Sequence, residues 1–290
     1  MTVDGIPPAN RQCLIKDLKV IEILCEVLYY PFKAKWFQIN EVIQYPLLLK
    51  IFQLAYRLIK HTIREYRPNE LYASQWVDLF MMHAMQCDQE NDLFAEPTLT
   101  ELIDNNKVVL ENRIQRETIS SFVEMLTDRE KHQKYVNILR ALVNCDGEAV
   151  VSNQGEISRL LLDNEQTKSA LIFNLRKANG RIEIQVYNDW IDLYAFPEIS
   201  EEKDGGKLLY YFTSMILLLS DLCLDRNFTA ISPLSDLYPY ELCNEILCGP
   251  YDLATRNSFV RLMTQLWIDR DFSEIQLPNK VRIWNQLDNQ

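Results

Sequence analysis

The chain has 290 residues, of which 48% are hydrophobic and 24% are charged, a composition typical of a globular protein with a sizeable core. Its net charge of −11 disfavours general binding to nucleic acids, because a negative surface repels the phosphate backbone. Only 7 residues are glycine, which argues against glycine-rich phosphate loops and long arrays of strands and turns. We therefore expect a helical protein that has no nucleic-acid partner.

The seven cysteines indicate neither a metal site nor a disulfide framework. Their number is odd, none forms a Cys-x-x-Cys pair, and most lie within apolar helical patterns. Cys243 and Cys248 are five residues apart without a nearby histidine, a spacing that disfavours zinc. We predict buried, reduced thiols in a protein that faces the cytosol.

Apolar residues at helical spacing predict three helices in the first part of the chain. One covers residues 15–28 and ends before Pro31, the second runs over residues 46–67, and the third covers roughly residues 70–86. The apolar stripe of the second helix, expected to face the core, comprises Leu47, Ile51, Leu54, Leu58, Ile59 and Ile63.

Shorter helices are predicted in the central part of the chain. Thr98 followed by Glu101 has the spacing of a capping box, which predicts a short helix that begins at Thr98. A turn is expected at Gly147, and Asn179-Gly180 suits the left-handed end of a helix. The further helices predicted here cover residues 108–114, 117–126, 133–144, 153–164 and 165–180.

The period of the apolar residues then changes from 3.6 to 2. Residues 181–196 alternate as a β-hairpin does, and residues 197–206 predict an exposed acidic loop. Residues 208–224 are the most apolar stretch but include Asp221, so we predict a buried helix rather than a membrane span. Helices over residues 239–247, 251–270 and 280–287 complete the chain.

Together these elements predict an all-α fold, an armadillo-like helical solenoid with a small inserted β-hairpin at about residues 181–196. No clear sequence repeat is present, so the solenoid is inferred from the rhythm of the helices alone. We expect a single domain over residues 10–287. It could divide into two sub-lobes, residues 10–180 and 207–287, which the hairpin and the acidic loop at residues 181–206 would join.

The sequence offers no candidate for catalysis, a metal site or a cofactor. It contains no motif of a zinc protease, a serine hydrolase or a P-loop nucleotide-binding protein. The carboxylates are spread over faces expected to be solvated, and His61, His83 and His132 are predicted to be surface or capping residues. We therefore expect no enzyme activity, no metal and no cofactor.

One helix face carries a charge opposite to that of the whole chain. Arg57, Lys60, Arg64 and Arg67 recur at intervals of three or four residues, so they line one side of the second helix. They form either a solvated face or a cup for a polyphosphate, to which Arg and Lys side chains donate charge-assisted hydrogen bonds.

Four segments resemble a known family. DLCLDRNFTAISPL, PYDLATRNSFVRLMTQLWIDRD and VRIWNQL, which begin at residues 221, 250 and 281, resemble the helical RIH domain of inositol 1,4,5-trisphosphate receptors. LVNCDGEAVVSNQ, from residue 142, resembles the matching stretch of ryanodine receptors. The order of the segments agrees over residues 10–287, which is nearly the whole chain.

The resemblance implies a cytosolic part of a tetrameric calcium-release channel, on the cytoplasmic face of the endoplasmic reticulum. In such receptors this solenoid forms one wall of the inositol-phosphate cleft and relays its closure toward the pore. The implied partners are the β-trefoil domain that forms the other wall and further helical domains of the same receptor. The segment itself would not contact the membrane, and a tetramer would form only in the full-length channel.

The ligand residues of the family carry over only in part. Its basic trio corresponds to Gln53, Arg57 and Lys60, and its later basic pair corresponds to Thr127 and Asp128. Each lost charged contact weakens binding of an anion by on the order of a few kcal/mol, so we expect this chain alone to bind inositol trisphosphate weakly or not at all. The residues that remain as ligand candidates are Arg57, Lys60 and Arg64.

Asp225 and Arg226 stand where the most apolar helix is expected to end. They form either an ordinary polar cap or, together with Asp269 and Arg270, a structural joint that fixes how successive helices stack. The second interpretation predicts that Asp225→Ala lowers the melting temperature more than substitution of a surface residue such as Asp92.

Two functions are compatible with the sequence. The first is a cytosolic regulatory and signal-relay domain of a calcium-release channel that resembles inositol-trisphosphate receptors. The alternative is a stand-alone, cytoplasmic helical scaffold that binds protein partners and has no channel activity. A longer reading frame with trefoil and pore segments would support the channel, and a natural stop after Gln290 would support the scaffold.

Overall fold

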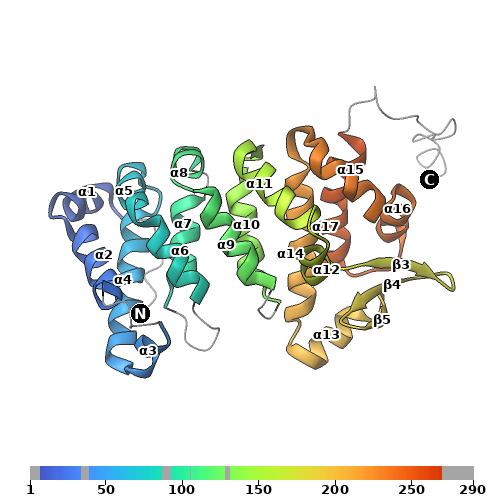
Figure 1. Ribbon diagram of the computed structural model, residues 1–290, viewed down its shortest axis with the longest axis horizontal. Helices are drawn as coiled ribbons and strands as arrows, with labels where there is room; N and C mark the ends of the chain where they lie inside the picture. Colours follow the sequence, from blue (N-terminus) through green and yellow to red (C-terminus); the bar gives the residue numbers. More distant parts are fainter. Residues whose placement is uncertain (1–6, 34–38, 87–92, 105, 128–130, 270–290) are drawn as a thin grey trace.

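Helices dominate the computed structural model, which describes residues 7–33, 39–86, 93–104, 106–127 and 131–269. They stand side by side in a row along the long axis of the molecule, from α1 at one end to α16 at the other (Figure 1). A small sheet lies beside the carboxy-terminal helices. The predicted fold class, an all-α helical array with a small β insert, is confirmed.

The regular elements in the first half of the described chain are helices and 3₁₀ turns. Its elements are α1 (Ala9–Asp17), α2 (Val20–Tyr29), the 3₁₀ turn η1 (Tyr30–Lys33), α3 (Ile39–Gln44), α4 (Pro46–Ile63), α5 (Arg67–Ala73), the 3₁₀ turn η2 (Ser74–Trp76), α6 (Val77–Gln86), α7 (Ala95–Ile103), α8 (Lys107–Asn112) and α9 (Arg116–Thr127). Pro46 begins α4, where its missing N–H leaves no hydrogen bond unmade. The helix predicted over residues 70–86 is divided in two by η2.

The second half combines helices with two small sheets. Its elements are α10 (Gln133–Val143), β1 (Asn144–Cys145), β2 (Glu148–Ala149), α11 (Val151–Leu162), α12 (Glu165–Leu171), β3 (Leu175–Ala178), β4 (Arg181–Val186), β5 (Asp189–Asp192), α13 (Phe196–Asp204), α14 (Lys207–Leu222), the 3₁₀ turn η4 (Leu224–Arg226), α15 (Phe228–Leu237), α16 (Tyr240–Cys248), α17 (Leu253–Met263) and the π-helical turn η5 (Thr264–Ile268). The predicted turn at Gly147 is confirmed, since it joins β1 to β2. The helix predicted over residues 280–287 lies outside the described residues.

The inserted sheet is larger than the predicted hairpin. Strands β3, β4 and β5 pair antiparallel in that order. The prediction of one helix over residues 165–180 is therefore wrong in its second half, because α12 ends at Leu171. Asn179 and Gly180, both with positive φ, form the turn between β3 and β4. A left-handed Asn-Gly pair serves a helix end and a two-residue hairpin turn equally well, so it could not decide between them.

The segment expected to be an acidic loop is largely helical. Helix α13 begins with Phe196, whose side chain is buried, and Gly205 and Gly206 follow it in the left-handed conformation. Pro197 in the first turn and glycine after the last turn are boundary signals of a helix. The acidic composition of the segment concealed these signals, and the prediction of a loop is wrong.

Helix α4 buries Ile59 and Ile63 of the predicted stripe, but the other four residues of that stripe are exposed. The buried side chains include Phe52, Tyr56, Ile59 and Ile63, each fully shielded from solvent. The exposed ones are Leu47 at 75%, Ile51 at 41%, Leu54 at 55% and Leu58 at 40% exposure. Apolar residues occupy both faces at helical spacing, so periodicity alone cannot choose between them. The face that carries the aromatic rings is buried, because the rings remove more apolar area from water.

His83 is a buried residue and not the predicted surface or capping residue. Its Nδ1 atom lies 2.7 Å from the hydroxyl of Tyr56, and the rings of Phe32 and Phe52 lie against it. Desolvation lowers the pKa of His83 to about 3, so the imidazole is neutral at physiological pH. His132 agrees with the prediction, since its side chain accepts a hydrogen bond from the backbone N–H of Lys134 at the start of α10.

Helix α14 is the buried helix that the sequence predicts. It packs between α10 and α17 and shields most of its side chains from solvent. Within the part of the chain that the structure describes, no helix has both the length and the apolar character needed to cross a membrane. The polar residues on α14 must therefore find partners inside the protein.

Cysteines occur as free thiols in the described residues, and four are buried as predicted. Those four are Cys25, Cys145, Cys223 and Cys243, whereas Cys13 and Cys248 are exposed. Desolvation raises the pKa of Cys223 and of Cys243 to about 12. The two thiols are therefore protonated at physiological pH and serve as small apolar groups in the core.

Candidate functional site

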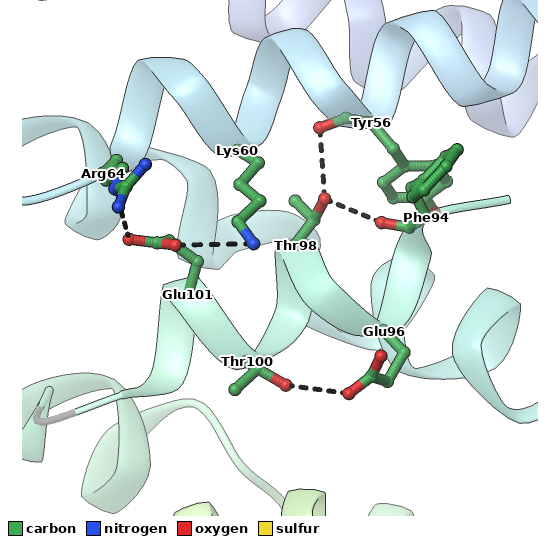
Figure 2. Close-up of polar contacts among 8 residues, drawn as sticks. All are labelled: Tyr56, Lys60, Arg64, Phe94, Glu96, Thr98, Thr100 and Glu101. Carbon is green, nitrogen blue, oxygen red and sulfur yellow. Dashed lines mark hydrogen bonds and ion pairs between the residues drawn. The ribbon is translucent and has the colours of Figure 1, made fainter. Parts of the chain in front are cut away.

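The predicted basic stripe lies where α4 meets α7. Lys60 Nζ is 3.7 Å from one carboxylate oxygen of Glu101, and Arg64 Nε is 3.9 Å from the other. Figure 2 shows both cations converging on this one carboxylate from α4 and from the residue that follows it. The side chains of Lys60 and Arg64 each remain 38% exposed. The carboxylate of Glu101 is thus shared by two cations that remain partly exposed to solvent.

Arg57 takes a different partner. Its guanidinium carbon lies 4.1 Å from the centre of the Phe94 ring, which is the geometry of a cation–π contact. Phe94 precedes α7 in the left-handed conformation, so the start of α7 directs the ring toward α4. Because an aromatic face does not neutralise the charge, Arg57 keeps its full positive charge at this surface.

The capping box predicted at Thr98 is absent, since α7 begins one turn earlier at Ala95. Thr98 is buried within the helix, and its hydroxyl lies 2.8 Å from the carbonyl oxygen of Phe94 and 3.1 Å from that of Tyr56. The second contact links α7 to α4 (Figure 2). Glu101, expected to complete the box, instead faces the basic stripe.

Arg67 leaves the stripe and pairs within α5. Its Nη1 atom lies 2.7 Å from a carboxylate oxygen of Glu70. Burial raises the pKa of Glu70, although the contact with Arg67 opposes that shift. The same oxygen of Glu70 accepts a hydrogen bond from the Asn106 side chain, 3.0 Å away. Arg67 therefore helps to attach α5 to the segment before α8.

The remaining ligand positions of the family add no positive charge to this group. Gln53 lies on α4, one turn before Arg57, and carries no charge. Thr127 ends α9, where its hydroxyl donates to the carbonyl of Glu124. Asp128 lies outside the described residues. The candidate anion site therefore comprises Arg57, Lys60 and Arg64.

The predicted structural joint consists of two separate contacts. Asp225 has φ +54°, and its carboxylate accepts a hydrogen bond of 2.9 Å from the backbone N–H of Ala149 in β2. Arg226 Nη2 lies 3.2 Å from a carboxylate oxygen of Asp269, with both side chains about half exposed. Arg270 lies outside the described residues. The described part of the joint connects the end of α14 with β2 on one side and with the end of η5 on the other.

A stronger polar contact near this joint was missed by sequence reasoning. Asp221, 4% exposed, accepts hydrogen bonds from Arg140 Nε at 2.8 Å and from Asn144 Nδ2 at 3.1 Å. Gln154 of α11 donates to the carbonyl of Leu224 at 2.9 Å. The signal was present, because an aspartate inside the most apolar helix requires a buried partner. The partner itself, 81 residues away, could not be read from local sequence.

Comparison with known proteins identifies the family. The model of the RIH domain matches residues 1–172. The chain belongs to the RIH domain family. This family is not one of enzymes, and within the described residues no cluster of three or more His, Cys, Asp or Glu side chains could hold a metal ion.

Two relatives extend the similarity of this RIH chain beyond the matched domain. The inositol 1,4,5-trisphosphate receptor itr-1 of Caenorhabditis elegans is 26% identical over 97% of the chain. The inositol 1,4,5-trisphosphate receptor-like protein A of Dictyostelium discoideum is 25% identical over 80% of the chain. The chain spans 10% and 7% of the lengths of these two proteins. The resemblance to inositol-trisphosphate receptors is thereby confirmed.

Proposed function

We propose that this RIH chain is a helical regulatory and signal-relay domain of an intracellular calcium-release channel similar to inositol 1,4,5-trisphosphate receptors. The observation that carries the proposal is membership of the RIH family, together with similarity to two such receptors. The channel would place the domain on the cytoplasmic face of the endoplasmic reticulum. Its partners would be the β-trefoil domain and further helical domains of the same receptor, which would form a tetramer.

A continuous series of packed helices supports the relay. Helix α4 packs on α7, α7 on α10, α10 on α14, and α14 on α17. Polar contacts also connect the helices at two of these steps, since Lys60 pairs with Glu101 and Arg140 pairs with Asp221. A displacement at α4 would reach α17 through rigid elements, because close-packed helices transmit strain. We infer a single domain over residues 10–287, since α10 and α14 connect the two predicted sub-lobes directly.

The face of α4 is proposed to contribute one wall of a ligand cleft. Arg57, Lys60 and Arg64 would supply the positive charge, and a phosphate would compete with Glu101 for two of them. The carboxylate of Glu101 disfavours an anion on its own, and Gln53 adds no charge. We therefore expect the isolated chain to bind inositol 1,4,5-trisphosphate more weakly than micromolar affinity.

Titration calorimetry of the isolated chain with inositol 1,4,5-trisphosphate tests this expectation. Micromolar affinity would contradict it. Where weak binding is measurable, replacement of Arg57 and Lys60 by Gln should abolish it, whereas Lys16→Gln on α1 should leave it unchanged. Equal loss in both variants would indicate attraction by net charge rather than a site on α4.

The relay is tested by a replacement within a related receptor. The matching segment of the C. elegans receptor is exchanged for this chain, and release of calcium from vesicles is measured after addition of inositol 1,4,5-trisphosphate. We expect release to persist with reduced sensitivity to the ligand. A chimera that folds, assembles and reaches the membrane but releases no calcium at any ligand concentration would refute the proposal.

A stand-alone scaffold is the second candidate function. It is favoured by the exposed stripe on α4, where Leu47 and Leu54 are more than half exposed at helical spacing. Apolar side chains in a continuous exposed stripe are typical of surfaces that bind another protein. The full reading frame decides between the two candidates, since a channel requires trefoil and pore segments and a scaffold requires neither.

A further inference from the structure

The exposed stripe of α4 consists of Leu47, Ile51, Leu54 and Leu58. Each of these side chains is at least 40% exposed. Among the residues that the structure describes, no other helix exposes four large apolar side chains. Single apolar residues at a surface need no explanation, but a contiguous group of them is typical of a surface that binds another molecule. The stripe therefore points to an interaction surface on α4.

The spacing of the stripe matches that of a pair of packed helices. Its four residues follow one another at intervals of four, three and four, which is the alternation of d and a positions in a heptad repeat. A narrow stripe of this kind is the seam of a coiled coil, in which each side chain inserts between side chains of a facing helix. At a rise of 1.5 Å per residue the stripe is about 16 Å long, so a partner helix of about two heptads covers it.

Two cations flank the stripe on one side. Lys50 directly precedes Ile51 and Arg57 directly precedes Leu58, so both cations occupy g positions of the repeat. Both side chains are exposed. Lys50 forms no ion pair within the described part of the chain, and the ring of Phe94 does not neutralise Arg57. Charges at g positions select the partner of a helix, because they face the flanking positions of that partner. These two cations favour a partner that carries carboxylates there.

A second copy of α4 does not meet this requirement. In an antiparallel pair the g positions of two copies face each other, so Lys50 and Arg57 would meet the same two cations. In a parallel pair they would face the e positions, which are Leu48 and Ala55 and carry no charge. Neither arrangement neutralises the cations, whereas a helix with acidic flanking residues does so.

We propose that the exposed stripe of α4 binds an amphipathic helix whose apolar seam is flanked by glutamate or aspartate. In this binding mode the four apolar side chains insert between those of the partner helix, and Lys50 and Arg57 pair with its carboxylates. The proposal rests on the same stripe as the scaffold function and names the kind of partner. It goes beyond the relay function, which requires no partner helix.

The probe is a synthetic helical peptide of about three heptads, with leucine at its a and d positions and glutamate at its e and g positions. Repulsion between the glutamates prevents this peptide from pairing with itself. The readout is fluorescence anisotropy of the fluorescein-labelled peptide with the full chain. We expect saturable binding that weakens about tenfold or more when lysine replaces glutamate in the probe. Failure of the glutamate probe to saturate, or equal binding of both probes, would overturn the proposal.

A pair of matched variants tests the apolar anchors. Leu47→Gln combined with Leu54→Gln removes both d positions and should weaken binding of the glutamate probe about tenfold or more. The control is Leu253→Gln combined with Val260→Gln, which changes two exposed apolar residues with the same spacing on α17. It should leave the affinity unchanged. All four side chains are more than half exposed, so both variants should melt close to the wild type. Equal affinities of the two double variants would refute the site.

The flanking charge is tested by a single reversal. Lys50→Glu should weaken binding of the glutamate probe and strengthen binding of the lysine probe, because the ion pair with the partner changes sign. Lys50 is exposed, so this variant also provides a test if the double leucine variant does not fold. An unchanged preference between the two probes would show that Lys50 does not face the partner and would overturn the proposal.

Two measurements test other occupants of the stripe. A dimer in sedimentation velocity that dissociates in the Leu47→Gln, Leu54→Gln variant would assign the stripe to a second copy and refute the proposal. Displacement of the glutamate probe by vesicles of phosphatidylcholine and phosphatidylserine would assign it to a membrane surface, with the same consequence. A monomer that binds the glutamate probe in the presence of vesicles supports the proposal.

The outcome is distinguishable from that of the scaffold function, which the full reading frame decides. A chain that binds the glutamate probe but belongs to a longer channel would keep this proposal and lose the scaffold function. A stand-alone chain that does not bind the probe would keep the scaffold function and lose this proposal.

Discussion

The contacts between α4 and α7 and between α10 and α14 both join neighbouring helices through a cation and a carboxylate, but they differ in distance and burial. Lys60 and Arg64 lie 3.7 and 3.9 Å from Glu101, with the cations 38% exposed. Arg140 lies 2.8 Å from Asp221, whose side chain is 6% exposed. The exposed pair is weakened by water and salt, whereas the buried carboxylate depends entirely on its protein partners.

This difference indicates that the two contacts have different roles in the row of helices. The contact of α10 with α14 holds a fixed geometry, because separation would leave Arg140 and Asp221 without partners in a poorly solvated interior. The contact of α4 with α7 can exchange one anion for another at little cost. An exchangeable contact beside a fixed one is the arrangement that a domain needs if it is to respond to a ligand without losing its fold.

The largest effect is expected from removal of the buried carboxylate. Asp221→Ala leaves Arg140 and Asn144 without their acceptor, so the free energy of unfolding should fall by about 3 kcal/mol. Urea denaturation followed by circular dichroism measures the change. Asp221→Asn should cost less, because the amide oxygen still accepts a hydrogen bond. A loss below about 1 kcal/mol in Asp221→Ala would remove the distinction between the two contacts.

The dependence of stability on pH measures a further buried polar group, the imidazole of His83, which packs against α4. The pKa of His83 is about 3 in the folded protein and about 6.5 in the unfolded chain, so stability is complete above pH 6.5 and is lost as the pH falls. Between pH 6.5 and 5 this residue alone should lower the free energy of unfolding by about 2 kcal/mol.

The control for this titration is a variant without an ionisable group at position 83. His83→Gln can still bond to the hydroxyl of Tyr56, and it should lack that part of the pH dependence. Tyr56→Phe should keep the dependence, because desolvation and not the hydrogen bond lowers the pKa of His83. Parallel pH profiles for the wild type and His83→Gln would show that the buried imidazole is not the cause.

A smaller effect is expected at the joint after α14. Asp225→Ala removes the acceptor of the Ala149 N–H and leaves alanine at φ +54°, which should cost about 1 to 2 kcal/mol. The melting temperature should fall further than in Asp236→Ala, which alters an exposed aspartate on α15. Asp92, the control expected from the sequence, lies outside the described residues. Equal melting temperatures would assign Asp225 to an ordinary helix end.

Sequence reasoning recovered the helices where one boundary signal was unambiguous. Pro46 fixed the start of α4, and the run of apolar residues fixed α14. It failed where one signal has two physical meanings. Asn179-Gly180 ends helices and also turns hairpins, and the two apolar faces of α4 have the same period. Only tertiary packing decides such cases, because it selects which surface is removed from water.

Local sequence patterns were limited in the same way for the candidate sites. The spacing of Arg57, Lys60, Arg64 and Arg67 predicted one row along a single helix. Arg57 and Lys60 do share α4, but α4 ends at Ile63, so Arg64 follows its last residue and Arg67 begins α5. The partners of Arg57, Lys60 and Arg64 are Phe94, which precedes α7, and Glu101 on α7. Neither partner could be derived from a pattern within α4. A local pattern reveals which side chains share a helix face, but the charge that opposes them depends on how the helices pack.

The smallest change in the free energy of unfolding should come from the exposed contact between α4 and α7. The variant that tests it is compared with Asp221→Ala. Glu101→Gln removes the carboxylate shared by Lys60 and Arg64, yet water already solvates both cations. Exposed ion pairs contribute little, so the free energy of unfolding should change by less than about 1 kcal/mol, and by less still at high salt. The same variant should bind anions more tightly than the wild type, because two cations lose their internal competitor. A loss of stability as large as that of Asp221→Ala would make the two contacts equivalent and would leave α4 no exchangeable face.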